Sequence, residues 1–235
     1  MGGTEPRAVG GIEMARFEVV PERAALLDID MQNLFVEGYP VSAPDGLATL
    51  GRINRLAAAC RDAGVLVIHA RHVLRPDGSN AGVLGDLHPE VRAGILDARG
   101  AAAALHPALV FDPRDILLDK PRYGAFHGTD LELILRGRGV DTVIVAGIAT
   151  NICCDTTARE AAARDFRVLF LSDGTATGGT DDRTPAEIQA ATLATLGGAF
   201  GEVLSVEEVV TRIADGARRG PDRATAPAND RTART

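Results

Sequence analysis

Aromatic side chains are scarce in this chain of 235 residues: they make up 4% of it, and tryptophan is absent. A surface on which nucleic-acid bases stack is therefore not expected. Basic residues are also in the minority, because 25 lysines and arginines stand against 32 acidic residues and the formal net charge is −7. This charge excludes the broad basic surface that binds nucleic acid or anionic lipid, so we expect neither a nucleic-acid partner nor a membrane partner.

Cysteine and long apolar runs are rare as well. Three cysteines are too few for a disulfide scaffold, and they predict reduced thiols. No apolar run approaches the length of a membrane span, and residues 1–20 lack the basic start and apolar core of a secretory signal. From these absences we expect a cytoplasmic protein.

Short apolar runs, which are typical of strands buried on both faces, alternate with segments of helical periodicity. The expected strands are 24–30, 65–70, 115–118, 142–146, 168–171 and 203–205. The expected helices are 47–63, 131–138, 152–164 and 185–196. This alternation predicts a single-domain α/β fold with a doubly wound parallel sheet. We expect the domain to cover 18–215, with a flexible tail at 1–17 and a disordered tail at 216–235, because neither tail has the composition of a core.

Three reactive side chains follow three of the expected strands. Asp30 ends the first apolar run, Lys120 follows the third, and Cys153 lies in the turn after the fourth. Ligands of doubly wound sheets bind beyond the carboxyl ends of the strands, so these side chains are expected to converge there. A helix N-terminus and a nearby lysine both favour a thiolate, which attacks acyl carbon readily. The sequence therefore predicts an acidic Cys153 thiol that acts as a nucleophile.

Other residues of these types have structural interpretations. Buried cysteines often serve as small apolar side chains, which is our interpretation of Cys60 and Cys154. Asp28 shares a strand face with Asp30, and a structural hydrogen bond is its simplest role. The histidines form no compact ligand pattern, so we expect no metal and no other cofactor.

Three segments together are similar to a known family. They are IDMQN at 29–33, KPRY at 120–123 and GIATNICC at 147–154. In this order they resemble the isochorismatase-like cysteine hydrolases, over residues 22–205. The resemblance implies a six-stranded sheet in the order 3-2-1-4-5-6 with helices on both faces, and a catalytic triad of Asp30, Lys120 and Cys153. It also implies a cis peptide before Ala149, and an oxyanion hole made by the N–H groups of Ala149 and Cys153.

The resemblance narrows the expected chemistry. True isochorismatases lack the cysteine, so Cys153 favours the amidohydrolase branch of the family. Nicotinamidases carry an Asp-x-His metal motif where this chain has Ala70-Arg71-His72, which disfavours both that substrate and the metal. We therefore expect hydrolysis of an amide, a carbamoyl or ureido group, or a lactam of a small molecule through a thioester. The expected assembly is a homo-oligomer, a dimer or a tetramer.

Two alternatives remain open: a hydrolase of the same fold that cleaves an ester, lactone or vinyl ether, and a binding protein without catalytic activity. Candidates for substrate binding follow from loop position alone. They are Phe35, Tyr39, His72, Arg75, Tyr123, Phe126, His127 and Asn151.

Overall fold

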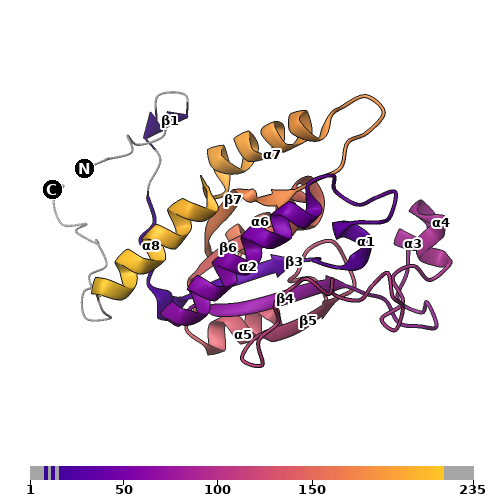
Figure 1. Cartoon of the computed structure of the whole chain (residues 1–235), viewed down its shortest axis with the longest axis horizontal. Helices are drawn as coiled ribbons and strands as arrows, with labels where there is room; N and C mark the ends of the chain where they lie inside the picture. Colours follow the sequence, from indigo (N-terminus) through magenta and orange to yellow (C-terminus); the bar gives the residue numbers. More distant parts are fainter. Residues whose placement is uncertain (1–7, 10–11, 14–15, 220–235) are drawn as a thin grey trace, which may run out of the picture.

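The computed structural model describes residues 8–9, 12–13 and 16–219, and its centre is a six-stranded parallel sheet (Figure 1). The strands are β3 (Ala24–Ile29), β4 (Leu66–His72), β5 (Ile116–Lys120), β6 (Thr142–Ile148), β7 (Arg167–Ala176) and β8 (Glu202–Leu204). They lie in the order β5-β4-β3-β6-β7-β8, which is 3-2-1-4-5-6 when the strands of this sheet are counted along the chain. The predicted fold class is confirmed. A short antiparallel pair, β1 (Ala8–Val9) and β2 (Ile12–Glu13), precedes the sheet.

Helices cover both faces of the sheet. On one face, α2 (Gly46–Ala63) packs against α8 (Val206–Arg219), in front of the strands in Figure 1. The other face is covered by α5 (Leu131–Gly137) and α6 (Asp155–Ala162), while α7 (Pro185–Ala199) packs against β7 and β8. The short helices are η1 (Pro21–Arg23), α1 (Asn33–Val36), α3 (Leu84–Leu87), α4 (Pro89–Arg92) and η2 (Thr150–Cys154).

Helix α2 shows how the sequence builds these layers. Its apolar residues recur every three or four positions, so Leu50, Ile53 and Leu56 lie on one buried stripe. Cys60 continues the stripe and is fully buried, as expected for a core residue. The helix ends at Gly64, which adopts a left-handed φ of 86° that glycine accepts without steric conflict.

Several boundaries differ from the predicted ones. Strand β7 continues past residue 171 to Ala176, although Ser172 and Asp173 are polar. These side chains are accommodated because Ser172 donates to the carbonyl of Leu204 and Asp173 accepts from the N–H of Val206. The helix expected from residue 152 instead begins as the π-helical turn η2, and α6 starts at Asp155.

The boundaries expected for the two tails need correction. Helix α8 continues past residue 215 to Arg219, because Val206, Val209 and Ile213 bury an apolar stripe that carries the helix forward. At the other end, Phe17 already packs against the core. Residues 1–7, 10–11, 14–15 and 220–235 of the expected tails lie outside the described residues.

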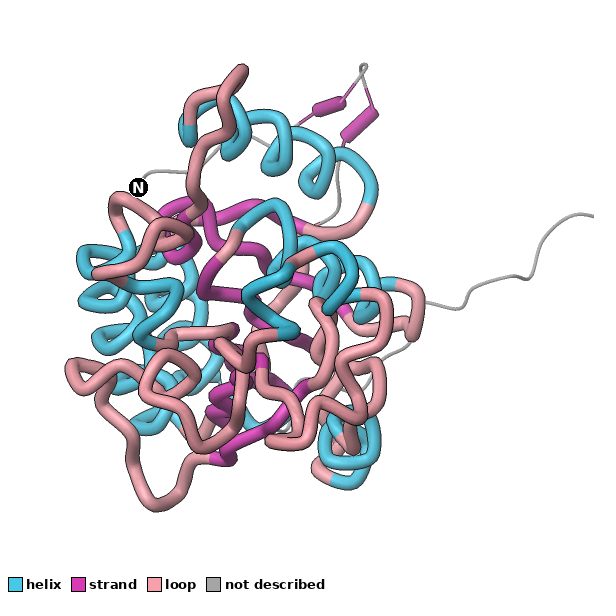
Figure 2. Tube along the Cα trace, turned by 90° about the vertical axis from the view of Figure 1, so that its right-hand side faces the viewer, coloured by secondary structure: helices cyan, strands magenta, loops and turns pink. Residues whose placement is uncertain are grey.

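The carboxyl ends of the strands meet at one edge of the molecule, where Figure 2 shows loops and short helices crossing in front of the strands. At this edge β3 and β6 approach closely, with Ile29 opposite Gly147. Gly147 has a φ of 123°, and a Cβ built on it would lie 2.0 Å from the carbonyl oxygen of Ile29. Glycine at this position therefore lets the strands that precede Asp30 and Cys153 lie side by side. None of the described helices combines the length and apolar character that a membrane crossing requires.

Candidate active site

Asp30 follows β3 and lies at the centre of the candidate site. Its backbone adopts a left-handed φ of 58°, which costs a non-glycine residue about 1–2 kcal/mol. Two backbone hydrogen bonds hold it there: its N–H donates to the carbonyl of Ala70 at 2.8 Å, and its carbonyl accepts from the N–H of Gln32 at 2.7 Å. The side chain is fully buried. Residues held in such conformations cluster at functional sites, and the carboxylate faces two of the other predicted residues.

Lys120 ends β5, and its ammonium is fully buried beside Asp30. The Nζ atom lies 2.8 Å from Asp30 Oδ2 and donates to the carbonyls of Arg122 and Tyr123, each at 3.0 Å. Burial acts to lower the pKa of Lys120, but the interactions that raise it, with the charge of Asp30 foremost, outweigh burial and the pKa is raised. Burial raises the pKa of Asp30, and the charge of Lys120 opposes this without cancelling it. Lys120 therefore stays charged and neutralises the carboxylate.

Cys153 lies in η2, and its sulfur lies within 4.8 Å of a carboxylate oxygen of Asp30. Burial is the main cause that raises the pKa of this thiol, and the charge of Asp30 adds to it. Lys120 acts in the opposite direction but is outweighed. The predicted acidic thiol is therefore wrong for the free protein, because the loss of solvent around the buried sulfur outweighs the effect of the nearby ammonium. Cys153 rests as a protonated thiol beside a base.

The turn before the thiol is fastened at both of its polar residues. The peptide between Ile148 and Ala149 is cis, as the resemblance implied. Thr150 donates to Gln189 of α7 at 2.5 Å, and Asn151 accepts from Thr177 at 2.6 Å. These bonds tie η2 to the end of β7 and to α7, and so fix the position of the thiol. The side-chain oxygen of Asn151 is engaged in this contact, and its predicted role in substrate binding stays a prediction.

Gln32 is a positioning residue, a role that its sequence pattern did not indicate. Its side-chain nitrogen donates to the carbonyls of Ala103 at 2.7 Å and His72 at 3.0 Å, and its side-chain oxygen accepts from the N–H of His72 at 2.7 Å. The side chain is fully buried. It therefore ties the end of β4 to the loop around residue 103, directly beside Asp30. Its place two residues after Asp30, within the IDMQN segment, was the available signal.

His72 is brought into the site, as predicted. It ends β4 opposite Lys120 and is buried, and one ligand atom each of Asp30, His72 and Cys153 lies within 4.8 Å of the others. A carboxylate, an imidazole and a thiol are ligands that could hold a metal ion. The ammonium of Lys120 already neutralises Asp30, however, and this opposes a second cation at the same carboxylate. The expected absence of a metal stays a prediction.

Three aromatic candidates pack against one apolar cluster, and one of them, Tyr123, contacts the site. Tyr123 accepts from Lys120 through its carbonyl, its ring stands edge-on to His72 with centroids 5.9 Å apart, and its hydroxyl lies 3.2 Å from His88 Nε2. Phe35 and Tyr39 are half-buried and pack against the apolar cluster of Leu34, Leu74, Leu84 and Leu96. This cluster also contacts Tyr123, so all three rings pack against the same apolar cluster.

The remaining candidates do not gather around the triad. Phe126 is buried: its ring lies against Phe166 at a centroid distance of 5.8 Å, in the apolar cluster that also contains Cys153, and its predicted role stays a prediction. Loop position gave no information about the direction of its side chain. His127 is exposed, and Arg75 is exposed at a cavity of about 280 Å³ that Asp119 and Pro121 also line. Their predicted roles in substrate binding stay predictions.

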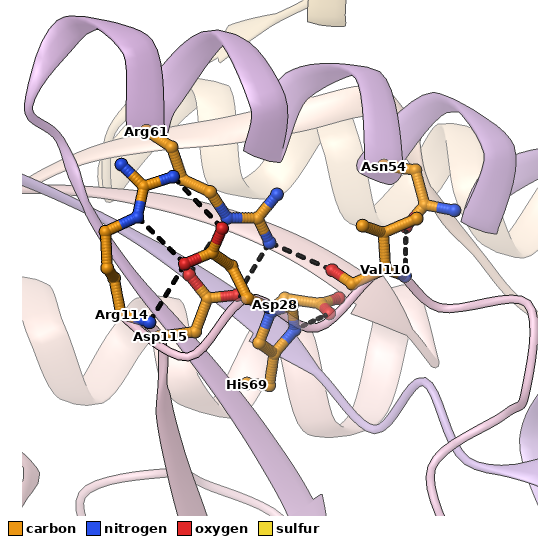
Figure 3. A network of polar contacts seen from close by, with 8 residues as sticks. Asp28, Asn54, Arg61, His69, Val110, Arg114 and Asp115 are labelled. Atoms are coloured by element: carbon orange, nitrogen blue, oxygen red, sulfur yellow. Dashed lines mark hydrogen bonds and ion pairs between the residues drawn. The ribbon is translucent and has the colours of Figure 1, made fainter.

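A second buried polar cluster lies on the α2 side of the sheet (Figure 3). His69 places Nδ1 at 2.6 Å from Asp28 Oδ2 and Nε2 at 3.1 Å from Asp115 Oδ2, and Arg61 of α2 donates two hydrogen bonds to Asp115. Burial acts to lower the pKa of His69, but Asp28 and Asp115 outweigh it and the pKa is raised. The structural hydrogen bond expected for Asp28 is therefore confirmed, and the cluster ties three strands or strand ends to α2.

The doubly wound sheet and the buried thiol, carboxylate and ammonium at its carboxyl edge define a cysteine hydrolase of α/β fold. The isochorismatase domain family model matches residues 24–208, and the chain belongs to this family. It is 32% identical over 222 residues to ureidoacrylate amidohydrolase RutB of Methylorubrum extorquens, covering 85% of this chain and 87% of the relative.

Solved structures agree with this membership. A cysteine hydrolase from Pseudomonas syringae pv. phaseolicola 1448A has a TM-score of 0.83 and 37% identity, covering 86% of this chain and 97% of that one. An isochorismatase family protein from Desulfovibrio vulgaris has a TM-score of 0.73 and 28% identity, covering 82% and 98%. The predicted resemblance is confirmed.

Proposed function

We propose that Cys153, Asp30 and Lys120 hydrolyse a carbon–nitrogen bond in a small, non-peptide amide. The family match and the amidohydrolase relatives support this class of reaction. The observation that carries the assignment of residues is that the Cys153 sulfur lies within 4.8 Å of an Asp30 carboxylate oxygen, and that this carboxylate lies 2.8 Å from a buried ammonium. A nucleophile, its base and the group that orients the base are thus present together.

In the acylation step, the Cys153 sulfur attacks the carbonyl carbon while its proton passes to Asp30. The N–H groups of Ala149 and Cys153 hold the negative charge that develops on the carbonyl oxygen. Asp30 then gives the proton to the departing nitrogen as the carbon–nitrogen bond breaks, which leaves a thioester and a free amine. Because the thiol is protonated at rest, proton transfer accompanies the attack and no thiolate is stored beforehand.

In the deacylation step, Asp30 takes a proton from water as the water oxygen attacks the thioester carbon. The carbon–sulfur bond breaks, the carboxylic acid departs, and the sulfur recovers its proton. Lys120 stays protonated throughout, because its ammonium is paired with Asp30 and donates to the carbonyls of Arg122 and Tyr123. It orients Asp30 and neutralises its charge.

A panel of amides, ureido compounds and lactams, assayed for released amine or ammonia, tests the proposal. Turnover of at least one member, with a Cys153 adduct detected by mass spectrometry and lost in Cys153→Ala, supports it. Turnover restricted to esters, lactones or vinyl ethers replaces it with the same-fold alternative. Tight binding of panel members without turnover identifies a binding protein.

The proposal extends to the assembly and location of the protein. We expect a dimer or tetramer in a cytoplasmic setting, as the sequence predicted. Light scattering after size-exclusion chromatography measures the assembly, and cell fractionation measures the location. A fully active monomer would contradict the expected dimer or tetramer. Recovery of the protein outside the cytoplasmic fraction would contradict the expected location.

A further inference from the structure

The hydroxyl of Thr157 joins the turn of the nucleophile to the loop 121–130, which connects β5 to α5. Thr157 lies in α6 and is fully buried. Its Oγ1 donates to the carbonyl of Cys153 at 2.7 Å and accepts from the N–H of Ala125 at 3.1 Å. A bond from threonine to the carbonyl four residues earlier is common in helices. The bond to Ala125 is not local, because it links positions 32 residues apart.

Glu160, one turn further along α6, holds the next residue of the same loop. Its Oε2 accepts from the N–H of Phe126 at 3.0 Å. The loop backbone lies directly on this carboxylate, since a Cβ built on Gly124 would clash with it. Two consecutive N–H groups of the loop are thus fixed by two side chains three positions apart, which lie on one face of the helix. Helix α6 therefore sets the position of the loop.

The loop carries the two carbonyls that hold the ammonium of the candidate triad. Arg122 and Tyr123, just before the fixed N–H groups, each accept from Lys120 Nζ at 3.0 Å. The same Nζ lies 2.8 Å from Asp30 Oδ2. Hydrogen bonds weaken steeply with poor geometry, so a displaced loop would release the ammonium from two of its three partners. The position of Lys120 thus depends on contacts made by α6.

Packing alone does not require a hydroxyl at position 157. Ala158 and Ala161, which are also fully buried in α6, fill the core without a polar side-chain atom. We propose that Thr157 is a positioning residue that holds the loop carbonyls against the Lys120 ammonium, and so keeps this cation aligned with Asp30. Its side chain acts through Lys120. The inference rests on the proposed function and adds to it a residue outside the triad.

Lys120 is the only lysine of the chain, and this permits a direct test. Protein made with isotope-labelled lysine gives a single side-chain ammonium signal by NMR, whose buried, bonded hydrogens exchange slowly with water. Thr157→Val keeps a similar shape without the hydroxyl and should speed this exchange by about 5- to 10-fold. On the panel amide that the wild type hydrolyses fastest, kcat should fall by about 10-fold or more while KM changes little. Thr157→Ser keeps the hydroxyl and should restore most of both values.

Thr142→Val is the matched control. Thr142 is buried and donates to Asp141 at 2.8 Å, but it lies at the amino end of β6, at the opposite edge of the sheet from the site. This variant should lower the midpoint of urea unfolding without changing the ammonium exchange or kcat. If Thr157→Val does not fold, Glu160→Ala provides the test instead, because it removes the second contact between α6 and the loop.

An ammonium exchange rate that stays at the wild-type value in the tested variant would overturn the inference and leave Thr157 a structural role. Faster exchange without loss of kcat, in a protein whose wild type is active, would also overturn it. The NMR signal does not depend on turnover, so failure of the proposed function is seen separately. If no amide of the panel is hydrolysed, but exchange is faster in Thr157→Val and slow again in Thr157→Ser, the positioning role holds and the reaction must be reassigned.

Discussion

Lys120 Nζ lies 2.8 Å from Asp30 Oδ2, and neither side chain is exposed to solvent. A pair of opposite charges in such a place is held only while both members are present, because removal of one leaves the other charged and unsolvated. The stability of the fold therefore depends on the protonation state of Asp30, the candidate base.

The first prediction follows from this pair. Lys120→Met should lower the free energy of unfolding by about 3–5 kcal/mol and abolish most turnover. The double variant Lys120→Met/Asp30→Asn should lose less stability than the two single losses added together, since no lone charge stays buried. Urea unfolding of the wild type and the three variants measures this coupling. Strictly additive losses would mean that the two side chains do not interact.

The second prediction concerns the Cys153 thiol. Because burial and the Asp30 charge raise its pKa, alkylation of the free protein should titrate with a midpoint above that of an ordinary thiol, about 8.5. Asp30→Asn removes the charge that opposes the thiolate and should lower the midpoint, whereas Lys120→Met should raise it. Rates of iodoacetamide labelling against pH report these shifts. A wild-type midpoint near neutrality would contradict this prediction and support the acidic Cys153 thiol expected from the sequence.

The third prediction separates the two neighbouring cysteines. Cys154 is fully buried, and its sulfur lies 3.7 Å from the carbonyl oxygen of Ala146, so it fills the core. Cys153→Ala should abolish turnover, while Cys154→Ala should keep most of it and lose about 1 kcal/mol of stability through the small cavity. Steady-state assays and urea unfolding of the two variants measure both effects. An active Cys153→Ala protein together with an inactive Cys154→Ala protein would reverse the assignment.

The fourth prediction concerns His69, whose pKa is raised by Asp28 and Asp115 against the effect of burial. A group whose pKa is higher in the folded than in the unfolded state stabilises the fold below the unfolded pKa, about 6.5, and loses this contribution as the pH rises through the folded pKa. The wild type should therefore exceed His69→Gln in unfolding free energy most at pH 6, by about 3 kcal/mol. The difference should shrink toward pH 9. Urea unfolding across this range measures it, and a difference that grows with pH would contradict it.

The fifth prediction concerns metal. The Lys120 ammonium already neutralises Asp30, and position 70 holds alanine where a metal-binding carboxylate stands in nicotinamidases. Turnover should therefore survive exhaustive chelation, with less than one zinc or iron per chain by elemental analysis. Loss of activity on chelation and its return with a single metal would show that Asp30, His72 and Cys153 hold an ion.

Much of the fold and of the central site was predictable because both depend on local pattern. Apolar runs gave the six strands and their approximate ends, and Asp30, Lys120 and Cys153 followed from the rule that such ends meet at one edge. The strand ends themselves were less accurate. Asp173 is polar in sequence, yet a hydrogen bond to the N–H of Val206 satisfies it within β7.

What could not be predicted depends on surroundings that have no sequence signature. Gln32 acts through the backbone of His72 and Ala103, and a backbone carbonyl is present at every position. The raised pKa of Cys153 comes mainly from burial, which is set by the packing of several distant segments. Phe126 follows a strand end as Tyr123 does, but the direction of its side chain places it in the core.

Gly147 sets a limit on how the protein can be re-engineered. With a Cβ only 2.0 Å from the carbonyl oxygen of Ile29, even alanine at this position would push apart the two strands that precede the base and the nucleophile. Exposed loop positions such as His127 meet no such restriction. A library that randomises the loops for a new substrate can therefore vary them widely, whereas active clones should retain a glycine codon at 147.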